Sequence, residues 1–249
     1  MPESPSASPD EPASARAHHA VWRDDRRRAV TAPTGNLALV ETRWLPVGEQ
    51  PALAKEQADA PASVTVTELK RSDIDTGETQ YGLRFWDSDA PAMHAFDRID
   101  AFDDDPEWVI EAQFTPIGID RTVPFEHIRD NGGTRDLVVP GDITFSRDGT
   151  RYNFAAFDDG GRLLLVFGDP TNGRDDETGT YGAGRFLFVQ RASSSDGFGE
   201  AGPVTLDFNR AFVPPCGFSS AYNCPMPPVQ NRFAVPVTAG EKNIIWRTQ

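Results

Sequence analysis

Apolar and polar residues alternate along most of the chain with a period close to two. Stretches of this kind that are rich in β-branched and aromatic residues are typical of half-buried β-strands. The stretches with this pattern are 37–45, 63–69, 79–86, 108–114, 121–128, 142–145, 151–157, 162–167, 186–190, 204–208, 233–237 and 243–246. The sequence therefore predicts about a dozen short strands.

Turn-forming residues separate these stretches at regular intervals. The turn signals are Gly132-Gly133, Pro140-Gly141, Asp148-Gly149 and Gly160-Gly161. The clearest unit contains three successive strands, 142–145, 151–157 and 162–167, joined by two of these turns. We therefore predict a mostly β fold, either an antiparallel sandwich or a barrel-like meander.

The start of the chain has a different pattern. Residues 1–16 are Pro, Ser, Ala and acidic residues without periodic apolar positions, so they bury too little apolar surface to stay ordered. The stretch 18–30 places a few apolar residues among Arg and Asp and predicts one short amphipathic helix that ends before Pro33. We expect a disordered tail over 1–17 and a single β-rich domain over 18–249.

The charge of the chain narrows the choice of partners. Its 38 acidic and 24 basic residues give a formal net charge of -14, so the average surface repels nucleic acid and anionic lipid. No apolar run approaches the roughly 20 residues that cross a bilayer. The first ten residues lack the basic and apolar segments of a secretory signal. We expect a cytoplasmic protein without a membrane or nucleic-acid partner, and the composition leaves its oligomeric state open.

The segment 206–232 contains the most unusual sequence in the chain. Five prolines restrict its backbone, although its composition is too polar and irregular for a strand. At its start, Asp207 and Asn209 are two residues apart on a predicted strand and would share one face. Arg185, four residues after Tyr181, could clamp Asp207 or an anionic group of a substrate. The alternative is a structural Arg–Asp pair beneath the proline-rich loop.

Cys216 and Cys224 lie in the same segment. Their spacing is longer than that of a zinc knuckle, and no second cysteine pair supplies the remaining ligands, so we expect no metal. A nucleophilic cysteine would need a base, and only His94 or His127 could provide one. Structural thiols are the simpler interpretation. The sequence also lacks the phosphate-loop, dinucleotide, serine-elbow and zinc-protease motifs, and we expect no cofactor.

Several short motifs together resemble one family. They are Thr180-Tyr181, Gly184-Arg185-Phe186-Leu187, Leu206-Asp207-Phe208-Asn209, Pro214-Pro215-Cys216, Cys224-Pro225-Met226-Pro227-Pro228, Asn231-Arg232 and Ala239-Gly240-Glu241-Lys242. This pattern is similar to that of a bacterial and archaeal family, domain of unknown function 1684, and the likeness extends to Trp22 and Arg26. The resemblance implies a shared site in the C-terminal half and supplies no reaction.

Two hypotheses follow for the function. In the first, a polar pocket binds or hydrolyses a small anionic molecule, with Asp207 as general base and Arg185 or Arg232 holding the anion. The other residues expected to bind the ligand are Tyr181, Asn209, Cys216, Cys224, Asn231, Arg232, Glu241 and Lys242. In the second hypothesis these residues only brace the loop, and exposed aromatic residues, Phe212, Phe218 and Tyr222, contact a partner.

Overall fold

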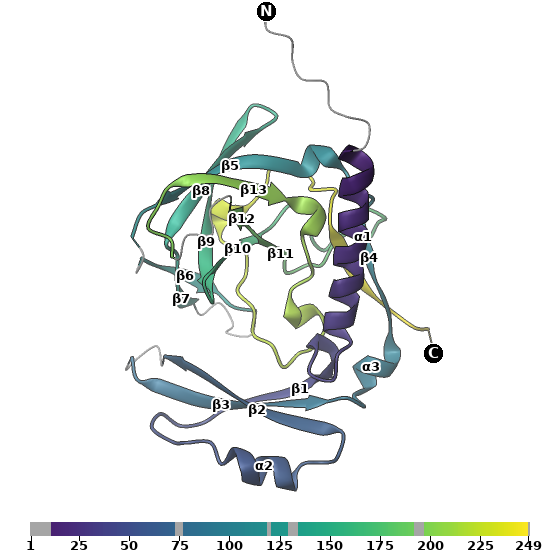
Figure 1. The fold of residues 1–249 in the computed structure, drawn as a ribbon, viewed down its shortest axis with the longest axis vertical. Helices are drawn as coiled ribbons and strands as arrows, with labels where there is room; N and C mark the ends of the chain where they lie inside the picture. Colours follow the sequence, from purple (N-terminus) through teal and green to yellow (C-terminus); the bar gives the residue numbers. More distant parts are fainter. Residues whose placement is uncertain (1–10, 73–76, 119–120, 129–133, 192–196, 249) are drawn as a thin grey trace, which may run out of the picture.

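The computed structural model describes residues 11–72, 77–118, 121–128, 134–191 and 197–248. It contains a β-barrel, a smaller three-stranded sheet beside it and a long helix that runs along the barrel (Figure 1). Every paired strand is antiparallel, so the predicted mostly β, antiparallel and barrel-like fold is confirmed. Within the described residues, no helix is both long enough and apolar enough to cross a membrane.

The strands and helices follow one another in a simple order. The helices are α1 (Glu11–Val30), α2 (Leu53–Asp59) and α3 (Pro91–Ala95). The strands are β1 (Leu39–Trp44), β2 (Val64–Ser72), β3 (Thr79–Asp87), β4 (Phe96–Ala101), β5 (Val109–Pro116), β6 (Thr122–Glu126), β7 (Thr134–Val138), β8 (Gly141–Arg147), β9 (Thr150–Asp159), β10 (Arg162–Phe167), β11 (Arg185–Phe188), β12 (Gln190–Arg191), β13 (Gly202–Asp207) and β14 (Glu241–Trp246).

One segment of chain closes the barrel. The main sheet has the strand order β11-β10-β9-β8-β5-β13-β12, and only Val189 separates its two edge strands in the sequence. The first half of this segment pairs with β10 and the second half with β13. The sheet therefore closes on itself, which removes the exposed edges of an open sheet.

Aromatic rings fill the interior of the barrel. Phe233, only 4% exposed, lies at their centre. The ring centroids of six neighbours lie 4.9 to 6.0 Å from its own: Trp108, Phe145, Tyr152, Phe154, Phe167 and Phe208. Most of these pairs meet edge to face, an arrangement that aromatic rings favour. The core thus depends on one residue from a segment without regular secondary structure.

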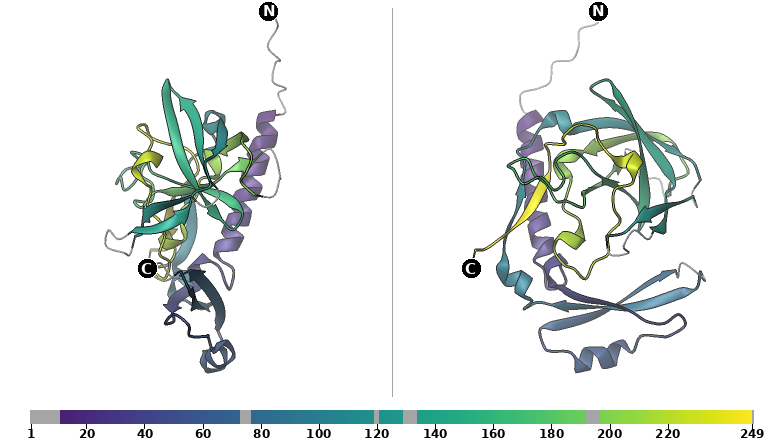
Figure 2. Two further views of the ribbon diagram at one scale, coloured as in Figure 1. Left: turned by 90° about the vertical axis from the view of Figure 1, so that its left-hand side faces the viewer. Right: turned by 180° about the vertical axis from the view of Figure 1, so that it is seen from behind.

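The small sheet has the order β1-β3-β2 and lies beyond one end of the barrel (Figure 2). Helix α2 packs along β2, and the side chain of Gln57 bonds to the backbone of Val64 and Val66. The other two pairs are two-stranded ribbons, β14 with β4 and β6 with β7. Strand β10 is buried on both faces, which explains its continuous apolar run from Leu163 to Phe167.

The structure corrects several local predictions. Helix α1 begins at Glu11 and includes residues that we expected in a disordered tail, whereas residues 1–10 lie outside the described residues, as does the predicted turn at Gly132-Gly133. The stretch 233–237 is not a strand. Pro236 lacks a backbone donor, and both backbone groups of Val237 bond to side chains instead of a neighbouring strand. The pattern also failed to indicate β4, β7, α2 and α3.

We predict that Phe233→Ala lowers the free energy of unfolding by about 3–5 kcal/mol, because it leaves a cavity among six rings. Urea unfolding followed by circular dichroism measures this change. Val229→Ala is the matched control, since Val229 is 88% exposed and its loss should change stability by less than about 0.5 kcal/mol. Equal stability of the two variants would show that Phe233 is not the centre of the core.

Candidate functional site

Arg185 lies at the start of β11 and is fully buried. Its Nη1 donates to the carbonyl oxygens of Ala239 (2.6 Å) and Glu241 (3.2 Å). Its Nη2 donates to Asp169 Oδ2 (2.9 Å) and to the carbonyl of Val237 (2.7 Å). Burial lowers the pKa of the Arg185 guanidinium, and the charge of Asp169 opposes this shift. Its terminal nitrogens are thus occupied in fastening the segment 237–241 to the barrel.

Asp169 completes this buried cluster. Its Oδ1 accepts hydrogen bonds from the backbone and the hydroxyl of Thr171 and from the backbone of Val237. The expected pair between Arg185 and Asp207 is therefore not formed, because Asp169 occupies the position of the partner. The alternative of a structural Arg–Asp pair describes Arg185 better, although with a different aspartate.

Asp207 and Asn209 do meet, as the sequence predicted. Asn209 Nδ2 lies 3.1 Å from Asp207 Oδ1, although Asn209 belongs to a 3-10 turn after β13 and not to the strand itself. The Asn209 amide also bonds to both backbone groups of Asp105. The second oxygen of Asp207 lies 2.9 Å from His19 Nε2 and 3.2 Å from Arg210 Nε. Asp207 thus connects the end of β13 to helix α1.

Glu241, at the start of β14, is almost completely buried beneath the same helix. Its Oε1 accepts a hydrogen bond from Arg26 Nε (2.9 Å), and its Oε2 accepts one from the backbone of Val213 (2.7 Å). Burial raises the pKa of Glu241, and the neighbouring Arg26 opposes that rise. Glu241 therefore fixes the position of the Arg26 guanidinium.

The remaining predicted residues fall into separate networks. Asn231 is buried and its amide bonds to the backbone of Ala155 and Val166, whereas Arg232 is exposed and donates to the carbonyl of Pro227. Lys242 forms an ion pair with Asp100 (3.0 Å). These contacts brace loops and strands around the barrel.

The two cysteines lie close together without a disulfide. The backbone N–H of Cys216 donates to Cys224 Sγ (3.3 Å), and the Tyr181 hydroxyl donates to Cys216 Sγ (3.7 Å). In the part of the chain that the structure describes, no three His, Cys, Asp or Glu side chains gather in a way that could hold a metal ion.

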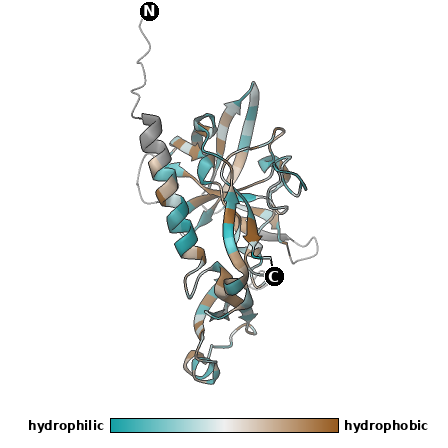
Figure 3. Cartoon of the chain, turned by 90° about the vertical axis from the view of Figure 1, so that its right-hand side faces the viewer, coloured by the Kyte–Doolittle hydropathy of each residue, from teal (hydrophilic) through white to brown (hydrophobic). Residues whose placement is uncertain are grey.

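Helix α1 supplies buried polar contacts that were not predicted from the sequence, although the family resemblance included Arg26. His19, Arg23 and Arg26 lie at positions i, i+4 and i+7, on one helix face, and contact Asp207, Asp104 and Glu241 respectively. Most of the coloured residues of this helix are hydrophilic (Figure 3). The stripe of His19, Arg23 and Arg26 can be seen in the sequence. Its partners could not be predicted, because they are about 80 to 215 residues distant in the chain.

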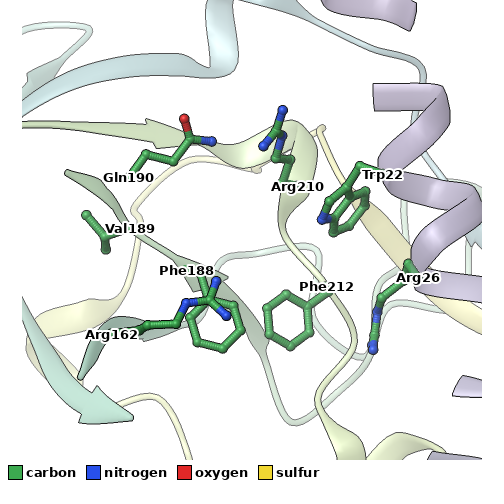
Figure 4. A pocket seen from close by; sticks show the side chains of 8 residues that line it. All are labelled: Trp22, Arg26, Arg162, Phe188, Val189, Gln190, Arg210 and Phe212. Carbon is green, nitrogen blue, oxygen red and sulfur yellow. The ribbon is translucent and has the colours of Figure 1, made fainter. Parts of the chain in front are cut away.

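A cavity of about 350 Å³ opens between α1 and the barrel. Its lining residues are Trp22, Arg26, Arg162, Phe188, Val189, Gln190, Arg210 and Phe212, and no acidic side chain is among these described residues (Figure 4). Trp22 and Arg26 extend from the helix, and the Arg162 guanidinium lies 3.6 Å from the centroid of the Phe188 ring. The cavity thus combines three cations with three aromatic rings.

A second cavity of about 350 Å³ continues from the first and shares Arg26, Phe188 and Phe212 with it. Its far end is mostly apolar and is lined by Leu137, Phe157, Leu164 and Phe186, with Asp159 and Cys224 beside them. We call the two cavities together the arginine–aromatic groove. One end of the groove is cationic and the other is apolar.

Phe212, Phe218 and Tyr222 do not form the exposed aromatic surface that the second hypothesis requires. Phe218 is buried, and Phe212 stacks on Phe188 within the groove. Tyr222 is partly buried beneath Arg84, and burial raises its pKa to about 12. These rings therefore belong to the interior and to the groove wall.

We predict that Arg185→Met lowers the free energy of unfolding by about 3–5 kcal/mol, because Asp169 loses its buried partner. Chemical unfolding measures the loss. Arg151→Met is the matched control, because Arg151 is exposed and has no ion pair within the described residues. A stability of Arg185→Met equal to that of the control would contradict the structural role of Arg185.

We predict that Glu241 makes the stability of the protein depend on pH. The raised pKa means that the folded state holds this proton more tightly than the unfolded state. Its contribution to the free energy of unfolding is therefore full below about pH 4.5, the ordinary pKa of Glu, and is lost as the pH rises through the folded pKa. The free energy of unfolding of the wild type, minus that of Glu241→Gln, should therefore fall from pH 4 to pH 8. A difference that rises over this range would refute the direction of the shift.

Comparisons with known proteins agree with the motifs of the C-terminal half. None of the curated proteins matches the chain. A solution NMR structure of an uncharacterized protein of Haloarcula marismortui is 32% identical, covers 59% of this chain and 77% of its own, and has a TM-score of 0.45. The family described as "Protein of unknown function (DUF1684)" matches residues 94–242, more than half of the chain. The chain therefore belongs to the domain of unknown function 1684 family.

Proposed function

We propose that the protein binds a small amphiphilic anion in the arginine–aromatic groove. The anionic group contacts Arg162 and Arg210, and the apolar body extends towards Leu137, Phe157 and Leu164. The volume of each cavity lies within the range of about 300–1,000 Å³ that is typical of small-molecule sites. A ligand with an anionic group and an apolar body matches the cationic and the apolar ends of the groove.

The proposal depends on the hydrogen-bond donors of Arg162 and Arg210 that line the groove. Arg162 has neither a hydrogen bond nor an ion pair within the described residues. Its guanidinium stacks on Phe188, and its positive charge opposes the burial that raises the pKa of Asp159, its partner across β9 and β10. Arg210 approaches Asp207 through Nε, while its terminal nitrogens have no hydrogen bond to the described residues. These donors can therefore bind an anion without first breaking a protein contact, and charge-assisted hydrogen bonds are among the strongest available.

Two acidic residues that the sequence indicated as site residues, Asp207 and Glu241, hold arginines of the groove wall in position. Glu241 holds Arg26, and Asp207 lies against Arg210, so each carboxylate orients a guanidinium that lines the cavity. Positioned groups of this kind lose little freedom when a ligand binds. In this proposal Asp207 and Glu241 act as positioning residues and do not contact the ligand.

The test uses 8-anilinonaphthalene-1-sulfonate, an aromatic anion whose fluorescence rises in apolar sites. We predict that Arg162→Gln weakens its binding by about tenfold, because a charged hydrogen bond contributes roughly 1.5–3 kcal/mol. Fluorescence titration gives the dissociation constant. Arg151→Gln, at the other end of the neighbouring strand β9, should bind like the wild type.

N-phenyl-1-naphthylamine has the same rings without the sulfonate and separates the two parts of the groove. Arg162→Gln should leave its binding unchanged, since this dye occupies only the apolar end. Equal sulfonate affinity of the wild type and Arg162→Gln would refute the anion site. Equal weakening of both dyes would indicate a general loss of the groove and would also count against it.

A further inference from the structure

A third cavity, of about 410 Å³, lies between the small sheet and the barrel. Thr42, Trp44, Arg71 and Arg84 line it from the sheet, and His127, Ser220 and Asn223 line it from the barrel side. Its volume is again in the range of a small-molecule site. It adjoins the far end of the arginine–aromatic groove at Asn223, which lines both, but Arg162, Arg210 and α1 do not contribute to it.

The register of the small sheet explains which side chains meet there. Thr42 of β1 pairs directly with Arg84 of β3, so the two side chains lie on the same face. Arg71 of β2 pairs with Gln80, which lies four residues before Arg84 and therefore on that face as well. Two arginines and a hydroxyl thus converge on the side of the sheet that faces the barrel.

Arg84 combines partial burial with a guanidinium that is available for binding. It is only partly exposed, yet within the described residues it has no hydrogen bond and no ion pair. Its guanidinium lies 5.3 Å from the centroid of Tyr222 and 5.8 Å from that of Trp86. Among the described residues, Arg84 Nε and Thr42 Oγ1 are both buried without a hydrogen-bond partner. Buried polar atoms are normally satisfied, and these two, unlike the other unsatisfied atoms of the described residues, lie together on the wall of one cavity, where they are available to an acceptor.

The charge of the cavity supports an anionic acceptor. The chain has a formal net charge of -14, but no acidic side chain is found among the described residues that line this cavity. Arg71 is held by Gln80 and stacks on Trp44, with its guanidinium 4.0 Å from the ring centroid. His127 Nδ1 donates to the carbonyl of Phe125, which fixes the orientation of the ring.

We infer that this cavity is a second ligand site, which binds a small polar oxyanion, a phosphate or carboxylate group, through Arg84 and Thr42. Arg84 supplies the charge, the Thr42 hydroxyl supplies a second donor, and Arg71 adds positive potential from the same face. The polar lining distinguishes this site from the arginine–aromatic groove, whose far end is apolar. The inference is independent of the function proposed for the groove.

The test measures the binding of inorganic phosphate and of citrate to the full chain by isothermal titration calorimetry at constant ionic strength. The two anions distinguish a phosphate ligand from a carboxylate ligand. Arg84→Gln should weaken the binding of the anion by at least about tenfold. Arg43→Gln is the matched control, because Arg43 is the neighbouring β1 residue on the opposite face, paired with Glu41 and Glu56. Arg162→Gln should also bind normally, which separates this site from the groove.

Chemical modification provides a second measurement that needs no variant. Phenylglyoxal modifies arginine side chains, and mass spectrometry of peptides locates the modified residues. Phosphate or citrate should protect Arg84 at least about threefold more than the exposed Arg151. The inference is overturned if neither anion binds the wild type, if Arg84→Gln binds as tightly as the wild type, or if both anions protect Arg84 and Arg151 equally.

Discussion

The polar contacts along one face of helix α1 fix the position of this helix against the barrel. His19, Arg23 and Arg26 contact carboxylates from three different parts of the chain, and several of these groups are largely removed from water. Removing one partner from such a buried pair leaves an uncompensated charge, so the helix has little freedom to shift. Since Trp22 and Arg26 lie on this helix, the same contacts also determine the wall of the arginine–aromatic groove.

Beneath the helix, hydrogen bonds from Arg185 replace the backbone hydrogen bonds that a neighbouring strand would make. The segment 233–241 has no regular structure before β14, yet Phe233 sits at the centre of the core. The Arg185 guanidinium bonds to three carbonyls of this segment and replaces the missing neighbour. Gly240 has φ of 78°, and a side chain there would meet the carbonyl oxygens of Phe208 and Ala211 at 2.6 Å. A glycine therefore lets this segment pack against the turn after β13, where the backbone N–H of Glu241 donates to the carbonyl of Ala211.

The sequence was sufficient to predict what depends on local pattern. Alternation and turn residues located the hairpins from β8 to β10, since neighbouring strands pair there. It also indicated that Asp207 and Asn209 lie together, and the structure places their side chains 3.1 Å apart. The partner of Arg185 could not be predicted, because Arg185 had several possible aspartates and only the three-dimensional arrangement selects Asp169. The stretch 233–237 shows the same limit, since its alternation reflects packing inside the barrel and its backbone bonds go to side chains.

The distribution of charge has a consequence for any ligand. An overall negative surface slows the approach of large polyanions, but screening confines this repulsion to roughly 8 Å at physiological ionic strength. A small anion inside a cavity therefore responds mainly to the nearest guanidinium groups, among them Arg162, Arg210 and Arg84. For the two sites that we propose, a small anion can therefore enter the cavity although the net charge of the chain is -14. This charge distribution supports our proposal of small anions, and not large polyanions, as ligands.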